Sequence, residues 1–187
     1  IYRLIARHYE REVLSRKISS SFNKEDFTLL LRDLDYGNNN EKGINLEEIA
    51  NHFIESIEGL VVSGRRVKFE NQEIDICCFN ISKDVFLWQL GAVILVECKN
   101  LKDKVSTKEI RSMIHLMQTK GVNTYILFSK NGVTKDAIKE INKQLIYQSY
   151  IIVIDKADLE NMIRNDLKPA DILREKINEL KSIEIML

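Results

Sequence analysis

Two short stretches of the sequence carry charged side chains inside otherwise apolar, β-branched runs. Residues 92–99 have the composition of a buried strand, yet Glu97 and Lys99 stand two positions apart near its end. Strand side chains alternate between faces, so both charges point the same way and Cys98 points the other way. Burying a carboxylate and an ammonium costs desolvation free energy, which favours a chemical role over a structural one.

Asp75 lies on the preceding predicted strand, where a hairpin would bring its carboxylate close to Glu97. Two converging carboxylates without Cys or His ligands suit a hard cation such as Mg²⁺ better than zinc. Such an ion, bound between carboxylates and a phosphate, neutralises developing negative charge and lowers the pKa of its water. Lys99 could then orient or deprotonate the attacking water, or stabilise the pentacovalent phosphorus. These residues therefore indicate metal-assisted phosphodiester hydrolysis.

The helix and strand patterns predict the elements that position this cluster. Glu47 lies at the edge of the apolar face of a predicted helix, so it can reach the cluster from that side. The order of elements predicts an α/β sheet flanked by helices on both faces. Turn-forming residues 35–40 indicate an N-terminal helical extension, residues 1–40, before a main domain, residues 41–187. Predicted helices cover residues 1–22, 25–34, 45–58, 106–120, 134–148, 158–164 and 171–182, and predicted strands cover residues 60–63, 67–70, 72–80, 92–99, 123–129 and 150–155.

Composition sets broad limits on the class of protein. A hydrophobic content of 44%, a charged content of 30% and zero net charge are typical of a globular protein, and no apolar run predicts a membrane span. The three cysteines lack metal-type spacing, so we expect reduced thiols and a cytoplasmic location. The first residue is Ile, which leaves open that further domains of a longer chain exist.

The residues resemble the PD-(D/E)xK phosphodiesterases, whose signature is an acidic residue followed by Glu-x-Lys or Asp-x-Lys on the next strand. The context is similar to the Mrr-like branch of bacterial restriction endonucleases, over about residues 43–164. That context comprises Leu46-Glu47, Glu73-Ile74-Asp75, Val96-Glu97-Cys98-Lys99-Asn100, Phe128-Ser129-Lys130-Asn131-Gly132-Val133-Thr134 and Val153-Ile154-Asp155.

The resemblance implies a restriction-endonuclease-like fold with a central mixed sheet, and Mg²⁺-dependent hydrolysis of DNA, with Mn²⁺ as a substitute. It also implies a homodimer that cuts double-stranded DNA, with a role in restriction or anti-phage defence. Carried over by position, Asp75, Glu97 and the backbone carbonyl of Cys98 would bind metal. Lys99 would be the catalytic lysine and Glu47 the helix carboxylate. The chain reads Gln-Glu-Ile-Asp where the signature has Pro-Asp, which leaves Glu73 as a substitute or second-metal ligand.

Other interpretations stay open from the sequence. Glu97 and Lys99 could form a structural ion pair between strands, and Glu47 could be a surface charge. The fold could serve as a non-catalytic DNA-binding or dimerisation module, or the enzyme could act on RNA or branched DNA. Residues 99–143 carry an excess of basic side chains, which predicts contacts with DNA phosphates. The expected DNA-contacting residues are Lys102, Lys104, Lys108, Arg111 and His115.

Overall fold

The structure is a computed structural model that describes residues 22–69 and 72–185. In this part of the chain, five strands form one mixed sheet in the order β1-β2-β3-β4-β5. The first three strands are antiparallel neighbours, and β3, β4 and β5 run parallel through helical crossovers. The strands are β1 (Leu60–Phe69), β2 (Gln72–Asn80), β3 (Val93–Lys99), β4 (Thr124–Ser129) and β5 (Tyr150–Asp155).

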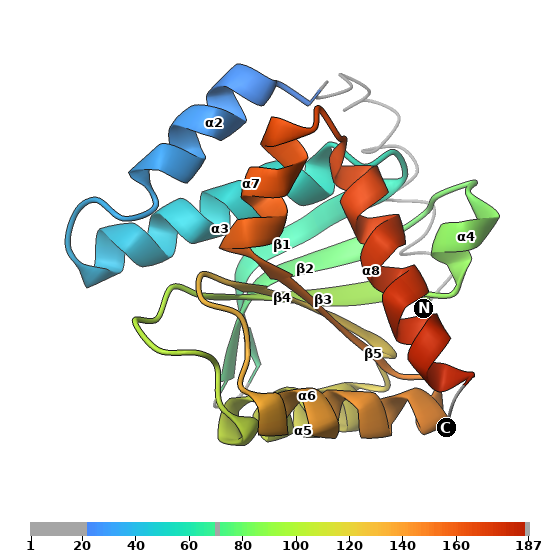
Figure 1. Cartoon of the computed structure of the whole chain (residues 1–187). Coiled ribbons are helices and arrows are strands. Elements are labelled where there is room, and N and C mark those ends of the chain that lie inside the picture. The colour runs from blue at the N-terminus through green and yellow to red at the C-terminus, as the bar shows by residue number, and fades with distance from the viewer. Residues whose placement is uncertain (1–21, 70–71, 186–187) are drawn as a thin grey trace.

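Helices cover both faces of the sheet, as the sequence predicts (Figure 1). One hydrophobic core lies between the sheet and α2, α3, α7 and most of α8, and the other lies under α5 and α6. The predicted α/β architecture, a central mixed sheet with helices on both faces, is therefore confirmed. Within the described residues, no helix has the length and apolar composition needed to cross a bilayer. The helices are α2 (Lys24–Asp33), α3 (Asn39–Glu55), α4 (Val85–Trp88), α5 (Thr107–Lys120), α6 (Lys135–Gln144), the 3₁₀ turn η1 (Leu145–Tyr147), α7 (Lys156–Arg164) and α8 (Pro169–Glu184).

Two local predictions were wrong. The sequence predicts two short strands around a turn at residues 64–66, whereas β1 is one strand with a bulge between Val62 and Gly64. A glycine in a strand marks such a bulge as readily as a turn, so the sequence did not distinguish them. Helix α3 begins at Asn39 rather than at residue 45, because Asn38 caps it and the Glu41 side chain accepts a hydrogen bond from the Asn38 backbone N–H.

The N-terminal helix α2 packs into the main core. Phe27, Leu31 and Leu34 are buried together with residues of α3 and the sheet. The division of the chain at residue 40 falls in the first turn of α3 and stays a prediction. The helix predicted for residues 1–22 lies outside the described residues except for its last position.

We expect Phe27→Ala to lower the free energy of unfolding of the whole domain by about 3 kcal/mol, because truncation leaves a cavity in the core. Phe27 is 2% exposed, whereas Leu29 on the same helix is 48% exposed, so Leu29→Ala is a matched control. Urea unfolding followed by circular dichroism measures both. A separate early transition in Phe27→Ala, with the main transition unchanged, would show that α2 is an independent appendage.

Candidate active site

Asp75 occupies the point where β2 and β3 diverge. The antiparallel register runs from the pair Phe79–Val93 to the pair Ile76–Val96. At the next position, the Asp75 carboxylate accepts a hydrogen bond of 2.6 Å from the backbone N–H of Cys98. The carboxylate therefore replaces a strand partner and is held against the backbone of β3.

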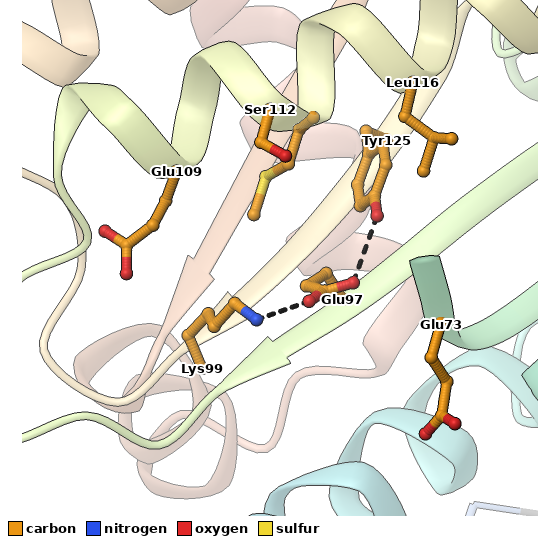
Figure 2. Close-up of a pocket in the computed structure, with 8 residues that line it drawn as sticks. Glu73, Glu97, Lys99, Glu109, Ser112, Leu116 and Tyr125 are labelled. Atoms are coloured by element: carbon orange, nitrogen blue, oxygen red, sulfur yellow. Dashed lines mark hydrogen bonds and ion pairs between the residues drawn. The ribbon is translucent and has the colours of Figure 1, made fainter. Parts of the chain in front are cut away.

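Glu97 lies on the next strand and is held by two donors. Lys99 Nζ is 2.5 Å from Glu97 Oε1, and the hydroxyl of Tyr125 donates to Glu97 Oε2 at 3.1 Å (Figure 2). The structural ion pair considered from the sequence thus exists, but it joins residues of one strand. Tyr125 comes from β4, the parallel neighbour of β3. The arrangement fixes both carboxylate oxygens and brings an ammonium beside them.

Burial and neighbouring charges shift the pKa values of Asp75, Lys99 and Tyr125. Burial, followed by repulsion from Glu97, raises the pKa of Asp75 from 3.8 to about 6; the Cys98 N–H opposes the shift and Glu47 adds to it. Burial alone would lower the pKa of Lys99, but attraction to Glu97 and the hydrogen bond between them hold it above 10.5. Burial, and then the charge of Glu97, keep the pKa of Tyr125 well above its ordinary value. Lys99 is therefore an ammonium and Tyr125 a neutral donor at neutral pH.

Glu47 lies on α3, within the electrostatic reach of Asp75. Its side chain is 12% exposed, and Arg66 of β1 holds both carboxylate oxygens, with Nε 3.1 Å from Oε2 and Nη2 3.3 Å from Oε1. Its charge raises the pKa of Asp75, as the charge of Glu97 does. Glu47 is therefore paired and largely buried, and not the solvated surface charge that the sequence left open.

A cavity bordered by Glu73 lies beside the Glu97–Lys99 pair. Glu73 is exposed, and Figure 2 shows its carboxylate directed away from the Glu97–Lys99 pair. A shallow cavity of about 190 Å³ lies between β3 and α5 and is bordered by Glu73, Glu97, Lys99, Glu109 and Tyr125. A ligand in this cavity would meet Lys99 directly.

The carboxylates of Asp75 and Glu97 and the carbonyl of Cys98 are oxygen ligands that suit a hard cation, although they are not arranged as a ready-made metal site. Among the described residues, no three His, Cys, Asp or Glu side chains form a ready metal cluster. The Asp75 carboxylate is nevertheless destabilised by burial and by two neighbouring carboxylates, and a cation would relieve both effects. Cys98 is a neutral thiol because burial raises its pKa, so its carbonyl is the group it can offer. The three cysteines, Cys77, Cys78 and Cys98, form no disulfide among the described residues.

The expected DNA contacts lie on the loop after β3 and on α5. The side chains of Lys102, Lys104, Lys108 and His115 are exposed. Arg111 is also exposed, but its Nη2 lies 3.2 Å from Glu140 on α6. Four of the five are thus open to a ligand, and Arg111 would first have to leave its carboxylate.

Sequence reasoning missed Tyr125 and Arg66. Tyr125 sits in an apolar strand predicted to be buried, where a hydroxyl needs a partner, and that was a usable signal. Arg66 was assigned to a turn, and its pairing with Glu47 depends on the bulged register of β1.

Comparison with known proteins identifies the family. The mixed sheet with helices on both faces defines a restriction-endonuclease-like α/β domain. A family model described as restriction endonuclease, of the Mrr catalytic type, matches residues 46–163. The match covers more than half of the 187 residues, and the chain belongs to this family, in the Mrr-like branch of the PD-(D/E)xK phosphodiesterases.

Solved structures resemble the chain more distantly. A repair endonuclease from Pyrococcus abyssi shares 20% identity over 65% of this chain and 49% of its own, with a TM-score of 0.42. SfsA of Pyrococcus furiosus, solved in complex with Ca²⁺, shares 16% identity over 62% of this chain and 57% of its own, with a TM-score of 0.36. The chain thus spans only about half the length of these structures. No curated protein matches the sequence significantly.

We expect Asp75→Asn to stabilise the metal-free protein near pH 8 and to have little effect near pH 4. The pKa of Asp75 rises from 3.8 to about 6 on folding, so the wild-type protein loses stability as pH rises between these values. Asparagine cannot ionise and can still accept the Cys98 hydrogen bond. The expected gain is about 1 kcal/mol, because partial contact with solvent reduces the effect.

Urea unfolding at the two pH values measures this gain, with Asp103→Asn as the control at an exposed carboxyl group of the next loop. A variant that is equally or less stable than the wild type near pH 8 would contradict the account of Asp75.

Proposed function

We propose that the chain is a divalent-metal-dependent endonuclease that hydrolyses phosphodiester bonds of DNA. The observation that carries the proposal is the convergence of Asp75 with the Glu97–Lys99 pair at the end of β3. Membership of the restriction endonuclease family supports the reaction class. A non-catalytic module would have no reason to keep a carboxylate whose pKa burial raises to about 6.

Asp75 and Glu97, with the Cys98 carbonyl, are the residues proposed to hold the cation, and Glu47 borders them. Mg²⁺, or Mn²⁺ in its place, would supply charge neutralisation at the phosphate and a water of lowered pKa. Glu97 is already oriented by Tyr125, so exchanging Lys99 for a cation leaves one of its oxygens fixed. Glu73 stays a candidate for an additional ligand, from an exposed position beside the same cavity.

We propose that Lys99 acts in its protonated form. Attraction to Glu97 raises its pKa in the metal-free protein, so Lys99 carries a proton there. Its ammonium can orient the attacking water and stabilise charge that develops on the phosphate oxygens. Of the roles left open by the sequence, orientation and charge stabilisation are therefore preferred to deprotonation.

Double-stranded DNA is the proposed substrate, and two copies of the chain are proposed to cut its two strands. The part of the chain that the structure describes contains one such set of residues, whereas a duplex presents two scissile strands. A role in restriction or anti-phage defence is proposed from the family alone. The three unpaired cysteines support a proposed cytoplasmic location.

We expect Lys99→Ala to lower the rate of plasmid nicking in Mg²⁺ by roughly a thousandfold, because charge stabilisation of the transition state is lost. Lys83→Ala is the matched control. Lys83 lies in the connection between β2 and β3 at the opposite end of β3 from Lys99. Conversion of supercoiled to open circular DNA measures the rate.

Wild-type protein that binds DNA but leaves it intact in Mg²⁺ and in Mn²⁺ would contradict the proposed activity. Equal nicking by the wild type and Lys99→Ala would contradict the assigned mechanism alone. Cleavage of RNA in preference to duplex DNA in the same assay would contradict the proposed substrate.

We expect DNA affinity to fall steeply as the salt concentration rises, because Lys102 and Lys104, in the loop after β3, are proposed to contact phosphates. We expect Lys104→Ala to reduce the slope of log affinity against log salt by about one unit, because one phosphate contact is lost. Arg111→Ala should have a smaller effect, since its guanidinium is already paired with Glu140. Fluorescence anisotropy in chelator measures both slopes. An unchanged slope for Lys104→Ala would remove that lysine from the interface.

A further inference from the structure

Arg66 lies on β1, at the register position opposite Asp75 of the neighbouring strand β2, and its backbone conformation is strained. The register places it between the pairs Arg65–Ile76 and Val67–Ile74, on the outer strand of the described sheet. Its φ angle is +49°, in the left-handed region that residues other than glycine seldom adopt. Such strain persists only where surrounding contacts outweigh it, and it is typical of functional positions.

The side chain of Arg66 pairs with Glu47. A carboxylate that is only 12% exposed needs a partner, and Arg66 supplies two parallel hydrogen bonds to its two oxygens. The hydrogen bond and the charge of Glu47 raise the pKa of Arg66, and the charges of Glu73 and Asp75 act in the same direction. The guanidinium thus places a positive charge beside the carboxylates of the proposed cation site.

We propose that Arg66 is a built-in counter-ion that pairs with Glu47 in the metal-free protein and competes with the divalent cation for the carboxylate site. The inference rests on the proposed function and adds a regulatory step to it. When a cation neutralises the carboxylates of the site, the electrostatic attraction that holds Arg66 on Glu47 becomes weaker. Its side chain is already 50% exposed, so it can turn outward without rearranging the sheet.

A DNA phosphate is the ligand that suits the released guanidinium, because its planar fork matches phosphate oxygens and its charge is permanent. DNA binding would then draw Arg66 away from Glu47 and strengthen cation binding. By linkage, the cation would strengthen DNA binding by the same factor. Arg66 would in this way couple the two events at one residue.

Arg65 provides a matched control on the neighbouring position of the same strand. Its Nη2 lies 2.6 Å from Glu48 Oε1 but 3.9 Å from Glu47 Oε2, so it is chiefly paired outside the site. Replacing either arginine by alanine removes one positive charge and keeps a Cβ atom. The two variants differ in which carboxylate loses its partner.

The test is calorimetric titration of Mn²⁺ into DNA-free protein. We expect Arg66→Ala to bind Mn²⁺ roughly three- to tenfold more tightly than the wild type, because a competing charge-assisted pair is lost. Arg65→Ala should match the wild type within about twofold. Arg66→Lys, which keeps the charge but loses the fork, should fall between them, and it carries the test if circular dichroism shows that Arg66→Ala is unfolded.

Weaker or unchanged Mn²⁺ binding by Arg66→Ala, with normal binding by the wild type, would overturn the competition and leave the proposed function standing. Absence of Mn²⁺ binding in the wild type and both alanine variants would overturn the proposed function as well. In anisotropy measurements, Ca²⁺ should strengthen duplex binding more for the wild type than for Arg66→Ala. Equal strengthening would show that Arg66 does not pass to the DNA.

Discussion

Repulsion among carboxylates at the end of β3 is the constraint on which the site depends. Asp75 is buried near Glu97 and within the electrostatic reach of Glu47, and this environment raises its pKa to about 6. Four positive or donor groups offset the repulsion: the Cys98 N–H, the Lys99 ammonium, the Tyr125 hydroxyl and the Arg66 guanidinium. The protein thus keeps like charges close together by giving each carboxylate a separate partner.

These partners come from three strands, β1, β3 and β4. Divergence of β2 and β3 frees the Cys98 N–H for Asp75, and β4 contributes Tyr125 to Glu97. The side chain of Asn100 donates to the backbone carbonyls of Leu34 and Lys42, which ties the α2–α3 segment to the end of β3. Placing like charges in a partly buried position lowers stability, and such losses are common where a site must bind a ligand.

The sequence was informative wherever local pattern decided the structure. The charges at Glu97 and Lys99 stand out from a β-branched run, and the order of helices and strands predicts an α/β sheet with helices on both faces. Long-range register was not accessible in this way. The bulge at Gly64 reads as a turn, so the position of Arg66 across from Asp75 could not be anticipated. The capping of α3 by Asn38 was equally ambiguous, because asparagine is favoured both in turns and at helix N-termini.

The electrostatic state of the site also needed three-dimensional information. From sequence, Lys99 could orient water, remove its proton or stabilise the phosphorus. The 2.5 Å contact with Glu97 raises the lysine's pKa and so favours the roles that use its proton. Tyr125 was overlooked because strand periodicity shows which face a side chain occupies and not which partner it meets.

The structure indicates that burial and neighbouring carboxylates destabilise the ionised form of Asp75, and we propose that a divalent cation relieves this destabilisation. Carbon-detected NMR titration of the aspartate carboxyl groups, with Asp75→Asn to assign the resonance, tests it directly. We expect a pKa of about 6 for Asp75 without metal and a clear decrease when Mg²⁺ is added. A pKa near 3.8 without metal, or one that Mg²⁺ does not change, would contradict it.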